Sequence, residues 1–92
     1  MVQAGVTLQV MPESVETDKE ALREDVKKII IEIYGDVGEI REEEVPLAFG
    51  LVQLKFTFII DEEKGTDAIE EKASEITGAS NAKVVDFRRA LG

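Results

Sequence analysis

Carboxylates are the only abundant side chains in this sequence that could do chemistry. The chain has 20 Asp and Glu residues, and three of them, Glu42, Glu43 and Glu44, follow one another directly. Calcium loops interleave carboxylates with Gly and Asn at fixed offsets, and this run does not. Consecutive residues of an extended chain point to alternate faces. We therefore expect a solvated strand edge here instead of a metal site.

Other reactive groups are missing. The chain has no histidine and no cysteine, which excludes disulfides, thiolate metal sites and nucleophiles activated by histidine. No glycine-rich phosphate loop lies between a strand and a helix. No pair of carboxylates stands out for acid–base work. We expect a binding protein that has no cofactor, holds no metal and is not an enzyme.

Length and charge narrow the class of partner. The 92 residues predict one domain, residues 1–92, with a net charge of −9. That charge repels phosphate backbones, so we expect no direct contact with nucleic acid. It suits a basic protein surface, although solubility alone also explains it. Residues 1–5 show no signal peptide, and no apolar run is long enough to span a bilayer, so we expect a cytoplasmic protein without membrane contact.

The first half of the chain predicts a strand and a helix. Residues 5–11 alternate between apolar and polar side chains, as in a half-buried strand, and Pro12 ends the pattern. Thr17 and Glu20 have the spacing of a capping box, which predicts that Thr17 caps a helix. The apolar residues that follow recur at spacings of three and four: Leu22, Val26, Ile29, Ile30 and Ile33. Gly35 and Gly38 mark the end of this helix.

The second half predicts two strands, a helix and a last strand. Pro46 marks its segment as an edge strand or a bulged one, and the topology below places it at an edge. Residues 52–61 form the clearest strand, with Leu54, Phe56, Phe58 and Ile60 on one face. A second helix begins at Thr66 or Asp67 and ends at Gly78. A short strand over residues 82–89 follows, and its adjacent valines leave its register open.

This order of elements predicts an α+β fold of the ferredoxin-like βαββαβ type. It has a four-stranded antiparallel sheet with both helices on one face and the first and third strands at the centre. RNA-binding versions of this fold stack bases on aromatic residues of the sheet. Here Phe56 and Phe58 lie on the face assigned to the helices, which argues against RNA binding. The residues alone thus predict an acidic, ferredoxin-like binding module.

Several motifs, in order along nearly the whole chain, resemble the short archaeal form of translation elongation factor 1-beta, which consists of its exchange domain alone. They are Val10-Met11-Pro12-Glu13-Ser14, Pro46-Leu47-Ala48-Phe49-Gly50-Leu51, Asp61-Glu62-Glu63 with Gly65-Thr66-Asp67, and Val84-Val85-Asp86-Phe87-Arg88-Arg89. The resemblance implies a guanine nucleotide exchange factor for elongation factor 1-alpha, the GTPase that delivers aminoacyl-tRNA to the ribosome. Such a factor speeds GDP release so that GTP can rebind.

Two alternatives to that function stay open. The chain could be a ferredoxin-like regulatory module that binds a small ligand as a dimer across sheet edges, whereas we expect an exchange factor to be a monomer on its own. Metal binding by the acid clusters is the third hypothesis.

The resemblance also implies a first partner-binding site, at Ala48, Phe49 and Gly50. Phe49 matches the aromatic residue that such factors push into the GTPase beside its nucleotide domain. The residues alone support another interpretation, in which Phe49 continues the face of Val45 and Leu47 into the core, because large aromatics are usually buried.

A second predicted partner contact lies near the chain end. Eukaryotic members of the family present a lysine there, close to the magnesium site, where a cation can compete with the ion. This chain ends in Ala90, Leu91 and Gly92, and its nearest cations are Arg88 and Arg89. These two arginines either contact the GTPase or only protect the exposed edge of the sheet from pairing with another strand.

Overall fold

The computed structural model describes residues 3–90, and its elements follow the predicted order. They are β1 (Gln3–Pro12), α1 (Lys19–Tyr34), β2 (Arg41–Pro46), β3 (Val52–Asp61), α2 (Asp67–Ser74) and β4 (Ala79–Ala90). Two single 3₁₀ turns, Ala48–Gly50 and Glu62–Lys64, flank β3. The ferredoxin-like α+β fold is confirmed.

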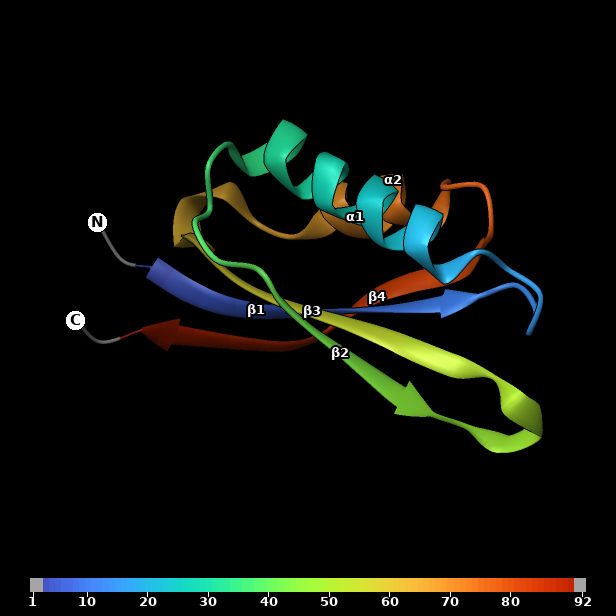
Figure 1. The fold of residues 1–92 in the computed structure, drawn as a ribbon. Coiled ribbons are helices and arrows are strands. Elements are labelled where there is room, and N and C mark those ends of the chain that lie inside the picture. Colours follow the sequence, from blue (N-terminus) through green and yellow to red (C-terminus); the bar gives the residue numbers. More distant parts are fainter. Residues whose placement is uncertain (1–2, 91–92) are drawn as a thin grey trace.

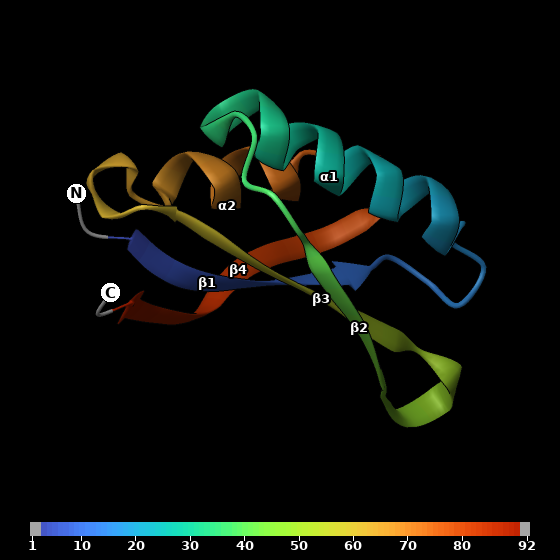
Figure 2. The same cartoon turned by 60° about the vertical axis from the view of Figure 1, so that its left-hand side comes forward.

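The four strands form one antiparallel sheet in the order β2-β3-β1-β4. Both helices cover the same face of this sheet, and the other face is open (Figures 1 and 2). The strand that contains Pro46 lies at an edge, as predicted, and β1 and β3 lie at the centre. The β2–β3 hairpin and the β1–α1 connection lie at one end of the molecule, and both chain termini lie at the other (Figure 1).

The core lies between the sheet and the helices. The inward side chains of β3 are at most 3% exposed: Leu54, Phe56, Phe58 and Ile60. Val6, Leu8 and Val10 of β1 and Leu22, Val26 and Ile30 of α1 complete this layer. Each such burial contributes about 1.5–3 kcal/mol, so the alternation in β3 is a main source of stability. On the open face, the hydroxyls of Thr7 and Thr57 are 3.2 Å apart and share a hydrogen bond.

The N-cap of α1 differs from the prediction. Asp18, not Thr17, caps the helix, because its Oδ1 accepts from the backbone amides of Glu20 and Ala21 at 3.1 and 3.2 Å. A carboxylate is a stronger acceptor than a hydroxyl at the positive end of the helix dipole. Thr17 instead accepts from the Ser14 amide within the preceding loop. The predicted capping box is therefore wrong.

Helix α2 is shorter than predicted, since it ends at Ser74 and not at Gly78. The Ser74 hydroxyl donates to the Glu70 carbonyl at 2.7 Å and accepts from the Ala82 amide at 3.2 Å. These bonds join the helix end directly to β4. Gly78, at φ 96°, lies in the tight connection before that strand, which begins at Ala79 and is thus longer than predicted.

A β-bulge explains why the register of the last strand was ambiguous. Thr7 pairs with Asp86 and Leu8 pairs with Val84, so Val85 has no partner on β1. The extra residue breaks the alternation of side chains, and Val85 is 44% exposed. The Glu70 carboxylate accepts from the Val84 amide at 2.7 Å, which ties the bulged segment to α2.

Candidate functional site

The β2–β3 hairpin ends in a tight turn over residues 47–51. The Leu47 amide donates to the Leu51 carbonyl at 2.7 Å, which closes the turn. Within it, Phe49 (φ 63°, ψ 27°) and Gly50 (φ 78°) both have left-handed backbone conformations. The alternation that joins Val45, Leu47 and Phe49 in the sequence therefore stops at the end of β2.

Phe49 points into solvent and is 94% exposed, whereas Phe56 and Phe58 are buried in the core. Of the two interpretations that the sequence left open, the core interpretation is therefore wrong. A left-handed conformation costs a non-glycine residue roughly 1–2 kcal/mol. Phe49 thus combines an exposed aromatic ring with a strained backbone, and neither stabilises the isolated protein. Strained residues of this kind cluster at functional sites.

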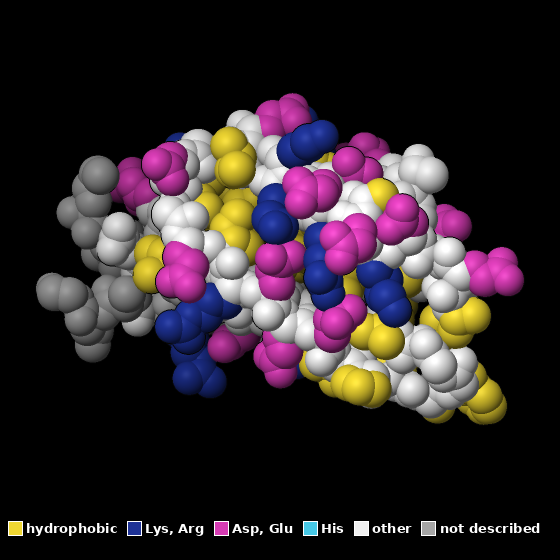
Figure 3. All heavy atoms as spheres, viewed as in Figure 1, with side chains coloured by type: hydrophobic (Ala, Val, Ile, Leu, Met, Phe, Trp, Pro, Cys, Tyr) yellow, Lys and Arg dark blue, Asp and Glu magenta, His cyan; other side chains and the backbone are white. Residues whose placement is uncertain are grey.

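The β1–α1 loop lies directly beside this turn. A Cβ atom at Gly50 would lie 3.5 Å from Val15 Cγ1. Val15 is 57% exposed and Leu47 is 37% exposed. We call Val15, Leu47, Ala48, Phe49 and Gly50 the apolar tip, and Figure 3 shows hydrophobic side chains gathered over this end of the molecule, at the lower right. Val15 was not among the contact residues predicted from the sequence, where its only signal is that it is an apolar residue within a polar connection.

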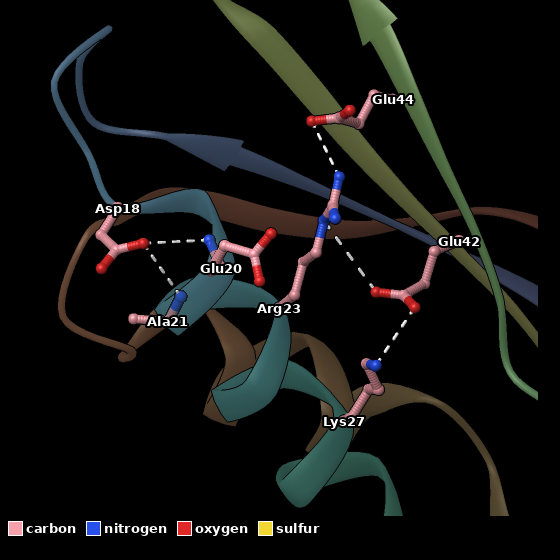
Figure 4. A network of polar contacts seen from close by, with 7 residues as sticks. All are labelled: Asp18, Glu20, Ala21, Arg23, Lys27, Glu42 and Glu44. Atoms are coloured by element: carbon pink, nitrogen blue, oxygen red, sulfur yellow. Dashed lines mark hydrogen bonds and ion pairs between the residues drawn. The ribbon is translucent and has the colours of Figure 1, made fainter.

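Ion pairs attach α1 to the edge strand behind the tip (Figure 4). Arg23 Nη2 lies 2.8 Å from Glu44 Oε1, and Lys27 Nζ lies 3.1 Å from Glu42 Oε2. Glu43, between these two acids, pairs in register with Lys55. The run of three acids therefore follows the alternation of a strand, and two of its members have basic partners. Within residues 3–90, no three acidic side chains lie together as candidate metal ligands.

The two arginines lie at the other end of the sheet. Arg89 pairs with Ala4, which pairs with Ile60 on β3, and Ile60 lies eight residues beyond Val52 at the hairpin. At about 3.4 Å per residue, Arg89 is therefore about 27 Å or more from the apolar tip.

Both arginines have acidic neighbours. Arg88 Nε lies 3.2 Å from Asp86 Oδ1, and Arg89 Nη2 lies 2.7 Å from Glu62 Oε1. Their side chains remain 83% and 68% exposed. The structure therefore does not bring the two predicted contacts together. Leu91 and Gly92 lie outside the described residues.

Tyr34 has a shifted pKa but lies away from the tip. Its hydroxyl donates to the Gly65 carbonyl at 2.6 Å, and its ring packs on Phe58 with centroids 5.8 Å apart. Burial, and then the charges of Asp67 and Glu70, raise the pKa of Tyr34 above its usual 10. The residue ties the end of α1 to the segment before α2, which is a structural role.

One hollow of 390 Å³ lies at the edge of the open face. It is lined by Gly5, Val37, Glu39, Arg41, Thr57, Phe58 and Ile59. One of its lining residues, Gly5, pairs with Arg88 on β4, and none of them belongs to the apolar tip. Within residues 3–90, no helix is long and apolar enough to cross a membrane.

The fold and the exposed tip define a small α+β domain that presents an apolar surface on a closed turn. Residues 5–90 match the family model described as the EF-1 guanine nucleotide exchange domain. The chain belongs to this family.

Curated relatives agree with this family. A protein of Methanothermobacter thermautotrophicus named elongation factor 1-beta is 44% identical over 86 residues, which cover 92% of this chain and 93% of the relative. Proteins of the same name from Methanosarcina barkeri and Metallosphaera sedula are 39% and 41% identical, and each match covers 97% of this chain and at least 97% of the relative. The family implies nucleotide exchange in translation elongation.

Proposed function

We propose that this chain is the nucleotide exchange factor of an elongation factor 1-alpha GTPase, on which it speeds GDP release and GTP rebinding. It works in the cytoplasm, as one domain over residues 1–92 and as a monomer until it meets its partner. It makes and breaks no covalent bond. Phe49, with Ala48 and Gly50, is its main contact residue.

The exposure of Phe49 is the observation that carries this proposal. A protein that leaves its aromatic ring 94% exposed on a closed turn has a preorganised anchor, because a tight turn loses little conformational freedom on binding. Aromatic anchors of this kind dominate protein–protein binding energies. Ala48 and Gly50 are small, so a partner can approach the ring closely on both sides.

Exchange then follows from differential binding. A factor that favours a GTPase conformation with a poor grip on nucleotide weakens nucleotide affinity, and by reciprocity nucleotide weakens the factor's own binding. Each tenfold decrease in nucleotide affinity corresponds to about 1.4 kcal/mol of coupling free energy. Arg88 and Arg89 supply a second contact, at the far end of the sheet.

The test is release of a fluorescent GDP from the GTPase in the presence of excess GTP. We expect a substoichiometric amount of this protein to raise the release rate well above the intrinsic rate. An unchanged rate, with both proteins folded, would rule the proposal out.

The hollow beside Arg41 favours one second candidate, a small-ligand module. That function predicts a dimer joined across sheet edges, so light scattering separates the two proposals. A monomer that accelerates GDP release supports the exchange factor, and a stable dimer without this activity supports the ligand module.

A further inference from the structure

The β1–α1 loop is a braced segment that holds Val15 in solvent. Three hydrogen bonds lie within the loop: Ser14 amide to Thr17 Oγ1 at 3.2 Å, Glu16 amide to Ser14 Oγ at 3.2 Å, and Thr17 amide to Ser14 carbonyl at 3.3 Å. A fourth bond, from the Glu13 amide to the Gly78 carbonyl at 2.9 Å, attaches the loop to the body of the domain. The loop therefore has a defined conformation, and Val15 is exposed although its backbone is ordered.

Val15 lies close to the hairpin turn that carries Phe49. Gly50 has a φ of 78°, and a side chain there would meet Val15 Cγ1 at 3.5 Å. Two loops that are far apart in the sequence thus lie next to each other, and each carries exposed apolar side chains. Val15 is 57% exposed, so most of its side chain is free to contact a partner. The loop also carries two exposed acids, Glu13 and Glu16, beside this apolar surface.

We propose that Val15 is a second contact residue of the surface that Phe49 dominates, and that the partner's matching surface is an apolar depression with basic residues on its rim. This inference rests on the proposed function and adds a second loop to its binding site. The acids complement a basic rim, and a chain with a net charge of −9 disfavours acidic partners. Because both loops are preorganised, little ordering is required when the partner covers them.

The test uses a substitution that keeps the shape of the side chain. Val15→Thr replaces one methyl group with a hydroxyl of similar size, so the spacing between the two loops and the geometry of the turn should be retained. A hydroxyl is harmless in solvent but unfavourable when buried against an apolar partner surface. We expect Val15→Thr to weaken binding to the nucleotide-free GTPase about tenfold, and to slow GDP release at subsaturating concentrations in proportion.

The matched control is Ile31→Thr on α1. Ile31 is also β-branched and is 53% exposed, but it lies outside the apolar tip. We expect its binding to stay within about twofold of the wild type, since isolated surface substitutions have small effects. Both variants should keep the wild-type melting temperature, and the amide chemical shifts of residues 47–51 should be unchanged in Val15→Thr.

The outcomes separate this inference from the proposed function. Tenfold weaker binding for Val15→Thr alone supports the two-loop surface. If wild type binds and Phe49→Ala weakens binding while Val15→Thr matches wild type, the inference is overturned and the exchange function stands. If wild type neither binds nor accelerates release, both are overturned.

Discussion

Phe49 is placed where stability alone would not place it. Its ring is exposed and its backbone is left-handed, a region in which Gly and Asn are far more common than bulky residues. The following Gly50 is also left-handed, and it can adopt this conformation without strain. A residue that tolerates this left-handed backbone conformation better than Phe should therefore relieve the strain at position 49.

We predict that Phe49→Asn is more stable than Phe49→Ala by about 0.5–1 kcal/mol in the free energy of unfolding. Both variants remove the aromatic ring, but only Asn tolerates a φ of 63° well. Urea unfolding at 25 °C measures the difference. Equal stability of the two variants would show that the turn has a different conformation in solution.

Tyr34 is the residue whose pKa links stability to pH. Its pKa is raised in the folded state, so the folded protein holds the phenol proton more tightly than the unfolded chain does. The resulting stability is complete below pH 10 and is lost as the pH rises through the folded-state pKa.

We expect Tyr34→Phe to lower the free energy of unfolding by about 0.5–1.5 kcal/mol at pH 7, because the bond to the Gly65 carbonyl is lost. Above pH 10 this difference between wild type and variant should shrink, since only wild type carries the phenol. Urea unfolding from pH 7 to pH 11 measures it. A difference that stays constant with pH contradicts the assignment.

Most elements could be predicted from the sequence because their patterns are local. The alternation of β3 and the spacing of apolar residues in α1 each depend on one repeating face, and Pro46 agrees with the edge position that the topology gives its strand. The errors arise where side chains from different elements meet. The end of α2 depends on Ser74 bonding to Ala82, and the register of β4 depends on a bulge tied to Glu70. The spacing of apolar residues in the sequence gives no information on either contact.

The apolar tip was predictable only in part. The resemblance identified Phe49. The two-residue alternation of a strand, when extended across the turn, also placed Phe49 on the same face as Val45 and Leu47. The left-handed turn that ends this period has no signal in the sequence except Gly50. Val15 could not be assigned to the tip, because it and its neighbour Gly50 are 35 positions apart in the chain.

At the scale of elements, α2 stabilises the bulge of β4 through one side chain. Glu70→Ala removes the acceptor of the Val84 amide, so we expect the free energy of unfolding to fall by about 1–2 kcal/mol. Glu71→Ala is the control, since Glu71 is exposed and should change it by less than about 0.5 kcal/mol. Urea unfolding measures both variants, and similar losses from the two would remove the special role of Glu70.

The whole molecule has two candidate contacts at opposite ends of its sheet. Its longest extent is 42 Å, and the apolar tip and the two arginines lie near the two ends. A single partner that covers both must contact much of the length of the domain. Phe49 offers apolar area, whereas Arg88 and Arg89 offer charge that nearby acids partly neutralise. The tip should therefore contribute more to affinity.

We predict that the two contacts act independently in binding the proposed GTPase. The fold-losses in affinity for Phe49→Ala and for the double variant Arg88→Ala with Arg89→Ala should multiply in the triple variant, because sites more than about 10 Å apart rarely couple. Calorimetric titration gives the affinities of wild type and of the three variants. If the arginine variant binds like wild type, the arginines only guard the sheet edge. If the losses do not multiply, the contacts are coupled.

We propose that this domain promotes nucleotide exchange through Phe49. The rate of fluorescent GDP release from elongation factor 1-alpha, measured with wild type and with Phe49→Ala, tests this role. Wild type should accelerate GDP release. The rate enhancement by the variant should be smaller by a factor of at least about ten, as expected when a central aromatic anchor is removed. Both should melt at the same temperature, because Phe49 makes no core contact. Equal acceleration of GDP release by the two folded proteins would show that exchange does not depend on Phe49.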